Sequence, residues 1–395
     1  MAALTERRFR PWRWARENLF NTWYNAVLTL AILAVLVFLV RPLVVWMLTD
    51  ARWEVIPATM KGLLTHTYPT EELWRIWTAL ALVMGLLGAS GGLWGGLIRD
   101  AAVRIGAGTL LLWLLLMIVG YGDRVWLLGV NAVLFGALGA GLALNGRRRW
   151  RVGALGLWVL APLLIVLLIG GIPGVSFLTP VGTSNWGGLM LTFLLAISGI
   201  VLSFPFGVLL ALGRQSKLPA IRWVSVGYIE LIRGVPLITV LFMMSIMLPF
   251  FTPPSIRPDL VVRAIAGFTL FTAAYIAENV RGGLQSIPTG QKEAAQALGL
   301  NAVLSTALIV LPQALRVTIP ANVGQFITLF KDTSLVLIIP LMDLFTKATR
   351  VLENPDWQGP DSEMLLFVAA VYWVFAYFMS NLSRRLERNL GVGER

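Results

Sequence analysis

Residues 293–312 read EAAQALGLNAVLSTALIVLP and stand between two long apolar runs. The first half of this stretch is polar and rich in alanine, whereas the runs before Val280 and after Thr318 are dominated by large apolar side chains. Short polar segments between apolar runs of membrane-spanning length are typical of polytopic membrane proteins. This alternation predicts the fold class.

The composition of the whole chain leads to the same prediction. Its 395 residues are 57% hydrophobic, and the mean hydropathy is +0.77, which is above the usual composition of soluble domains. Because backbone polar groups in lipid must be hydrogen-bonded within the protein, uninterrupted apolar runs favour helices. We predict an all-α fold, a polytopic helical bundle in a lipid bilayer.

We expect about ten transmembrane helices. Their predicted ranges are Asn25–Met47, Trp77–Ile98, Ile105–Tyr121, Val125–Asn145, Gly153–Gly170, Leu189–Leu212, Gly234–Thr252, Ala264–Val280, Thr318–Leu341 and Glu363–Leu382. Alternating sides from an inside N-terminus places 22 of the 32 Lys and Arg residues in cytoplasmic segments and 8 outside, with Arg41 and Lys331 inside spans. Since basic residues concentrate on the cytoplasmic side, we expect both termini in the cytoplasm.

Several classes of function have little support. The net charge of +12 comes from short basic clusters scattered between apolar runs, so membrane topology explains it better than nucleic acid does. The chain has no cysteine, its lone histidine, His66, has no neighbouring ligands, and no phosphate-binding loop, catalytic triad or HExxH motif occurs. We expect no enzyme activity, no metal site and no cofactor on this chain; any ATP must be bound by a partner.

The chain divides near 181–187, within a loop rich in Gly, Pro and Ser. Residues 1–184 form an N-terminal extension of about five plain apolar helices, in which Gly88, Gly92 and Gly96 are spaced for close helix packing. Residues 185–395 form a part with five helices, intramembrane charges and several prolines. We expect the function to concentrate in this second part.

The polar segment is predicted to begin with a short helix at Thr289, directly after Pro288, with Thr289 as its cap. Ala294 and Ala295 give the helix a small surface that another protein could close over, Glu293 offers an anchoring charge, and Gly299 allows a turn. From composition alone, an ordinary surface helix explains the segment equally well.

Lys331 and Asp332 are adjacent charges near the middle of the predicted span Thr318–Leu341, followed by Thr333 and Ser334. Unpaired, each charge would cost roughly 2.5 to 3.5 kcal/mol on insertion scales. Three explanations remain open. These residues form a polar knot that holds the second-part helices together, they form part of a translocation path, or the charges snorkel to the membrane interface.

Four further charges lie near the cytoplasmic ends of two predicted spans. Glu230 and Arg233 precede Gly234, and Glu278 and Arg281 flank the end of the next span. An interfacial anchor is the simpler explanation of the first pair. The two pairs could also meet across helices, and we then expect a cytoplasmic gate.

The spacing of the polar segment is more specific than its composition. Glu293, Ala294 and Ala295 are followed after three residues by Gly299, and then by Ile309 and the pair Leu311 and Pro312. This pattern resembles the EAA loop of ABC-importer permeases. The resemblance implies a type I importer core, with a coupling loop over residues 286–312 that sits in a cleft of the ATPase subunit. Coupling to the ATPase would fall to Glu293, Ala294, Ala295, Gly299, Leu311 and Pro312.

The resemblance extends over about 186–388. The matching stretches are TSNWGGLMLTF (183–193), IELIRGVPL (229–237), AENVRGGLQSIPTGQ (277–291), LPQALRVTIP (311–320) and FKDTSLV (330–336). Together they are similar to the polar amino acid permeases. The extension, with RENLFNTWYNAVLTL at 16–30, looks most like the long membrane subunit of the proteobacterial general L-amino acid permease.

The resemblance implies an inner-membrane permease subunit that carries polar or general L-amino acids inward. Its implied partners are two ABC ATPase subunits that bind ATP and Mg²⁺, a second, homologous permease subunit, and a periplasmic binding protein that delivers the amino acid. Two alternatives stay open: a secondary transporter driven by an ion gradient, and a non-transporting membrane scaffold.

Overall fold

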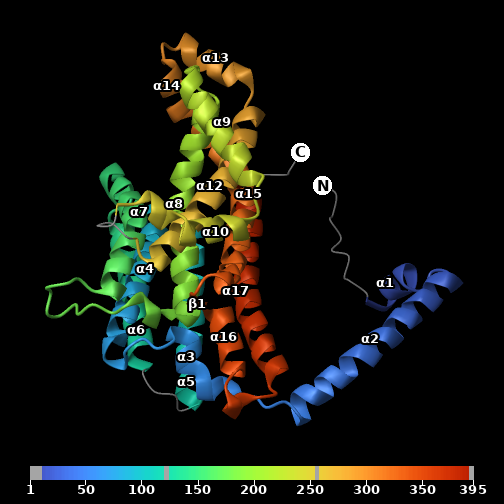
Figure 1. Cartoon of the computed structure of the whole chain (residues 1–395). Helices are drawn as coiled ribbons and strands as arrows, with labels where there is room; N and C mark the ends of the chain where they lie inside the picture. The colour runs from blue at the N-terminus through green and yellow to red at the C-terminus, as the bar shows by residue number, and fades with distance from the viewer. Residues whose placement is uncertain (1–10, 120–123, 254–257, 391–395) are drawn as a thin grey trace.

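The computed structural model describes residues 11–119, 124–253 and 258–390, and these residues are almost entirely helical (Figure 1). The first part contains α1 (Pro11–Asn18), α2 (Trp23–Thr49), α3 (Val55–Thr65), η1 (Thr70–Glu72), α4 (Leu73–Trp94), α5 (Gly96–Val119), α6 (Arg124–Ala143) and α7 (Arg148–Gly170). The second part begins with η2 (Thr183–Asn185), α8 (Gly188–Arg214), α9 (Pro219–Arg233), α10 (Leu237–Ile246), α11 (Leu248–Phe251) and α12 (Leu260–Ser286). It continues with α13 (Thr289–Ala297), α14 (Ala302–Ser305), η3 (Thr306–Val310), α15 (Leu311–Asp332), η4 (Thr333–Ile338), β1 (Met342–Asp343), α16 (Leu344–Leu352), η5 (Pro355–Trp357) and α17 (Asp361–Leu390).

The membrane-helix prediction is confirmed in kind. Among the described residues, 8 helices are long and apolar enough to cross a membrane, and α9 with α10 would make a ninth, broken span. The predicted span Ile105–Tyr121 falls partly outside the described residues; its first part lies in α5. The fold is an all-α membrane bundle.

The predicted span Gly234–Thr252 is not one continuous helix: it contains α10 and α11, and α10 meets the preceding α9 at an angle of 107°. Gly234 and Pro236 lie at the break: Pro236 adopts φ −59° and ψ 141°, outside the helical region, and caps α10. Because proline disfavours helical backbone in the residue before it and supplies no N–H, the helix cannot continue through this point.

In the first part, α4 and α6 pack at the distance that the glycine spacing predicts. A Cβ added at Gly88 would lie 2.1 Å from the carbonyl oxygen of Leu134, and one at Gly92 would lie 2.4 Å from that of Leu138. Gly96 does not belong to this face. It has φ +51° with open space around it, and together with Gly95 at φ +66° it ends α4 and starts α5, so the predicted span Trp77–Ile98 stops at Trp94.

Helix α2 stands apart from the rest of the chain. None of the most apolar 18-residue stretch of α2 is buried against other described residues, and Figure 1 shows it leaving the bundle at an angle. Among the candidate spans of the described residues, α2 alone has no buried residue in its most apolar stretch, so this stretch is available to lipid or to another protein.

The second part packs α8 against α12, α12 against α15, and α15 against α17. The buried centre includes Leu195, Phe268 and Leu329, each at most 1% exposed. After α15 the chain turns back: β1 pairs in parallel with Gly187 and Gly188 at the start of α8. The segment between α15 and α16 is thereby fixed to the start of α8.

Candidate functional site

Helix α13 projects beyond the bundle together with α14, at one end of the molecule (Figure 1). Glu293 and Ala294 are exposed on it, whereas Ala295 is 3% exposed and fixes the helix to the protein. The predicted start at Thr289 is confirmed, but the predicted cap is wrong: Thr289 is the first helical residue and makes no capping hydrogen bond. Pro288, with its fixed φ, sets the start instead.

Gly299 ends α13 in the left-handed conformation, with φ +82°. Its N–H donates to the carbonyl of Gln296 at 2.9 Å, and the N–H of Leu300 donates to that of Ala295 at 3.1 Å. Such a turn satisfies the free carbonyl groups at a helix end and favours glycine. The chain then enters α14, where the Asn301 side chain accepts from the Leu304 N–H at 2.9 Å.

Leu311 and Pro312 open α15 directly after a π-helical turn, η3. Leu311 is half-buried and Pro312 is exposed. The six residues of the EAA pattern therefore lie in one projecting unit that runs from α13 to the start of α15. Its outer face is open in this chain.

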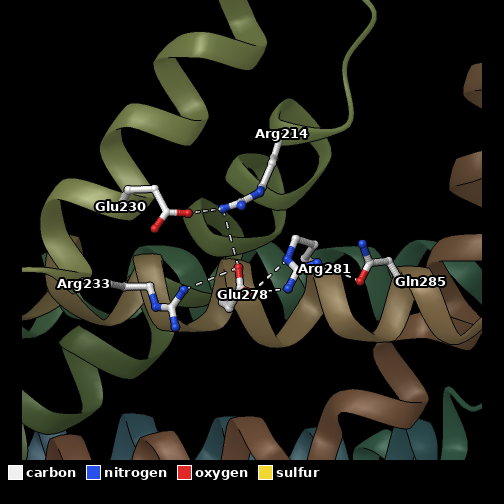
Figure 2. A network of polar contacts seen from close by, with 6 residues as sticks. All are labelled: Arg214, Glu230, Arg233, Glu278, Arg281 and Gln285. Carbon is white, nitrogen blue, oxygen red and sulfur yellow. Dashed lines mark hydrogen bonds and ion pairs between the residues drawn. The ribbon is translucent and has the colours of Figure 1, made fainter.

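The four charges predicted to meet across helices do come together (Figure 2). Arg281 binds Glu278 within α12, and its Nε donates to Glu278 Oε1 at 2.9 Å. Arg233, from the end of α9, lies 3.7 Å from Glu278 Oε2. Glu230 does not pair with Arg281; it accepts from a residue that the sequence analysis missed, Arg214 of α8, at 2.9 Å.

Arg214 makes this cluster a junction of three helices. Its Nη1 lies 2.9 Å from Glu230 of α9 and 3.6 Å from Glu278 of α12. Glu278 Oε2 is buried and forms no hydrogen bond, although two guanidinium groups flank it at 3.6 and 3.7 Å. Small shifts of α8 or α9 would convert either contact into a hydrogen bond, so the carboxylate is shared between two alternatives.

Lys331 and Asp332 are not mid-helix as predicted. They occupy the last turn of α15, which ends at Asp332 because the chain tightens into η4. Lys331 is exposed on this chain and lines a hollow of about 260 Å³ with Ser334, Phe345 and Tyr372. No ion pair joins either charge to another described residue. Ser334 donates to the carbonyl of Lys331 at 2.9 Å.

A polar knot exists beside them, built from other residues. Asp343 is fully buried, and its Oδ1 accepts from the backbone and side chain of Thr346 at 2.9 and 2.6 Å. Tyr372 of α17 donates to Asp343 Oδ2 at 3.2 Å, and Thr333 lies 3.3 Å from the Tyr372 hydroxyl. Of the four predicted residues, Thr333 belongs to the knot, and Lys331 faces outward from the chain.

Comparison with known proteins identifies the family. The family described as "Binding-protein-dependent transport system inner membrane component" matches residues 203–392. The inner membrane amino-acid ABC transporter permease protein YhdY of Escherichia coli (strain K12) is 37% identical over 96% of this chain and 93% of its own length. This chain belongs to the ABC-transporter permeases.

Further relatives of the permease agree. BztC of Rhodobacter capsulatus, a glutamate/glutamine/aspartate/asparagine transport system permease protein, is 36% identical over 96% of this chain and 93% of its own length. A structure titled "Crystal structure of an amino acid ABC transporter with histidines" aligns with 51% of this chain and 92% of its own chain. The sequence identity is 28% and the TM-score is 0.46. The family description makes the permease an inner-membrane component, and its described residues include several helices that are long and apolar enough to span a membrane.

Arg214, Asp343 and Tyr372 were the site residues that sequence reasoning missed. Arg214 follows a long apolar run, where basic residues usually mark the cytoplasmic side, so nothing in the pattern distinguished it from a topological anchor. Asp343 carried a usable signal: a single carboxylate that precedes LFTKATR is a typical helix cap. Its burial depends on β1 and α17, which the local sequence does not specify.

Proposed function

We propose that the permease carries polar or general L-amino acids into the cytoplasm as one membrane subunit of an ATP-driven importer. The observation that supports this best is the projecting unit of α13 and α14, whose outer face no described residue covers. In the proposal, α13 with Glu293, Ala294, Ala295 and Gly299 sits in a cleft of an ATPase subunit. The start of α15 at Leu311 and Pro312 passes the motion to the bundle.

The remaining assignments are part of the same proposal. ATP and Mg²⁺ are bound by two separate ATPase subunits, and no cofactor is bound by this chain. A homologous second permease offers the second coupling helix, because a pair of ATPases needs two. Both termini lie in the cytoplasm, and residues 1–184 form an extension of the importer core at residues 185–395.

The charges take two roles in the proposed cycle. The junction of Arg214, Glu230, Arg233, Glu278 and Arg281 joins α8, α9 and α12 and acts as the cytoplasmic gate. Lys331 and Asp332 border the translocation path, since an exposed, unpaired charge within a membrane protein needs water or a partner charge. The name of the relative BztC, which includes glutamate and aspartate, supports a polar amino acid as cargo.

Reconstitution in proteoliposomes tests the proposal. The complex purified with its ATPase should take up labelled glutamate or another polar amino acid only when ATP is inside and the binding protein is outside. Uptake driven by an ion gradient without ATP would instead identify a secondary transporter. Absence of uptake under every condition, with partner binding retained, would identify a scaffold.

A further inference from the structure

Helix α3 of the extension is built into the end of the molecule opposite α13 (Figure 1). Val55 and Leu63 are fully buried and pack with Leu344 and Ala348 of α16 in one apolar cluster. The fit with α8 is close, since a Cβ added at Gly188 would lie 2.2 Å from the carbonyl oxygen of Leu63. Helix α3 is therefore a fixed part of this surface.

The segment before α3 is fixed as well. The backbone N–H of Arg52 donates to Glu363 Oε1 at 2.7 Å, and Arg52 Nη2 donates to the carbonyl of Gln358 at 2.5 Å. Both acceptors belong to the loop and helix that follow α16. The extension and the second part thus form one continuous face here.

A hollow of about 260 Å³ lies between α3 and α16 on this face. It is lined by Thr59, Gly62, Lys347, Arg350, Val351, Asn354 and Trp357. Small-molecule sites usually have volumes of roughly 300 to 1,000 Å³ and enclose most of their ligand. This hollow is smaller and lies at the surface, so a single side chain of another protein suits it better.

The charge in the hollow is positive and incompletely paired. Lys347 crosses over α3, where a Cβ added at Gly62 would lie 3.0 Å from its Cε. No acidic residue pairs with Lys347 in the described part of the chain, and no acidic side chain lines the hollow. Arg350 pairs with Glu353 at 2.7 Å, but both side chains are more than half exposed, and such pairs contribute little and exchange readily.

The positive charge of Lys347 also affects His66. Its side chain lies beside Gly187 at the end of α3. Burial lowers the pKa of His66, and the positive charge of Lys347 lowers it further. The Lys347 charge therefore acts on a half-buried neighbour as well as on the hollow.

We propose that this hollow receives an acidic side chain of the substrate-binding protein, and that the N-terminal extension supplies one wall of the docking site through α3. The partner follows from the family, which is binding-protein-dependent, and the inference rests on the proposed orientation with α13 in the cytoplasm. The carboxylate of the acidic side chain pairs with the positive charges of Lys347 and Arg350, and the methylene groups of that side chain pack against Trp357. The interaction sets register and encounter rate, as complementary charges do at interfaces.

The test uses the complete reconstituted transporter and the substrate-binding protein encoded with it. ATPase activity is measured as the binding protein is titrated, for the native chain, Lys347→Ala and Lys61→Ala. Lys61 is a matched control because it is an exposed lysine of α3 that does not line the hollow. At low salt, the half-saturating concentration of the binding protein should be roughly tenfold higher for Lys347→Ala than for the native chain. This difference should become smaller at high salt, because salt screens the charges. Lys61→Ala should have the native half-saturating concentration.

A second variant tests the wall from the extension. Gly62→Leu fills the hollow from α3 and should also raise the half-saturating concentration, which decides the matter if Lys347→Ala fails to assemble. Stimulation of the native complex with unchanged titrations for Lys347→Ala and Gly62→Leu would overturn the docking site alone. A native complex that does not respond to the binding protein would refute the proposed importer and the site with it. A response to free glutamate that Lys347→Ala abolishes would make the hollow a substrate site and also overturn the proposal.

Discussion

At the scale of single residues, Glu278 is the centre of the charge cluster that joins α8, α9 and α12. It contacts three arginines, from α8, α9 and α12, and its side chain is 22% exposed. Removing one partner of a mostly buried charge cluster leaves the others uncompensated. The carboxylate thus holds together groups that would otherwise repel each other.

Glu278→Gln should destabilise the permease by about 1.5 to 3 kcal/mol, the range for hydrogen bonds to charged groups. If the cluster is the gate, the variant should also hydrolyse more ATP per amino acid transported. Thermal unfolding in detergent and the ratio of uptake to ATP hydrolysis measure the two effects. Glu230→Gln is the graded comparison, because Glu230 is 57% exposed and Arg214 is its one ion-pair partner among the described residues, so its effects should be smaller. Uptake and stability equal to the native values in Glu278→Gln would exclude both roles.

The sequence pointed to four of the five charges in this cluster and to a contact between the two pairs, which Arg233 and Glu278 make at 3.7 Å, but it did not predict the part of Arg214. Residue type and position near span ends were enough to single out Glu230, Arg233, Glu278 and Arg281. The pairing of Arg214 with Glu230 depends on how α8 and α9 pack, and helix packing is decided by contacts across the whole bundle. Asp343 and Tyr372 were missed for the same reason. Their hydrogen bond joins the end of β1 to α17, and the two residues are far apart in the sequence.

At the scale of elements, the projecting helix α13 depends on how it ends. Gly299 has φ +82° and no atom within 4 Å of an added Cβ, so a substitution there meets backbone strain and no steric clash. A non-glycine residue in this conformation costs about 1 to 2 kcal/mol. The turn at the end of α13 is therefore sensitive to substitution.

Gly299→Ala should therefore loosen the turn after α13 and weaken ATPase association by about tenfold. Gly290→Ala is the matched control: it adds the same methyl group to the same helix, also in open space, without a positive φ. Hydrogen exchange of the α13 amides and co-purification of the ATPase measure the two effects. If Gly299→Ala and Gly290→Ala showed the same hydrogen exchange and the same ATPase association, coupling would not depend on the conformation of Gly299.

Apolar runs predicted most elements, and the failures share one physical cause. The run at 234–252 is as apolar as a membrane span, yet its first helix, α10, begins only after Pro236 and lies at 107° to the preceding α9. Gly95 and Gly96 divide another run between α4 and α5, and α15 ends at Asp332 where the chain turns back to pair with Gly187. Hydropathy reports which residues avoid water, whereas backbone breaks and returning loops depend on individual residues and on contacts distant in sequence.

At the scale of the whole molecule, the proposal depends on which end faces the cytoplasm. The projecting helices α13 and α14 lie at one end, and α3 with α16 lies at the other (Figure 1). The excess of Lys and Arg in alternate segments supports the first end as cytoplasmic. All later assignments, including the docking hollow, change sides if this orientation is reversed.

The chain is suited to a direct test because it contains no cysteine. A single cysteine at Gln358, which is exposed and whose carbonyl accepts from Arg52 just before α3, should react with a membrane-impermeant maleimide in intact spheroplasts. A cysteine at Gln296, exposed on α13, should react only after the membrane is permeabilised. Labelling follows from solvent access alone, so it needs no transport activity. If Gln296→Cys were labelled in intact spheroplasts and Gln358→Cys were not, α13 could not meet a cytoplasmic ATPase.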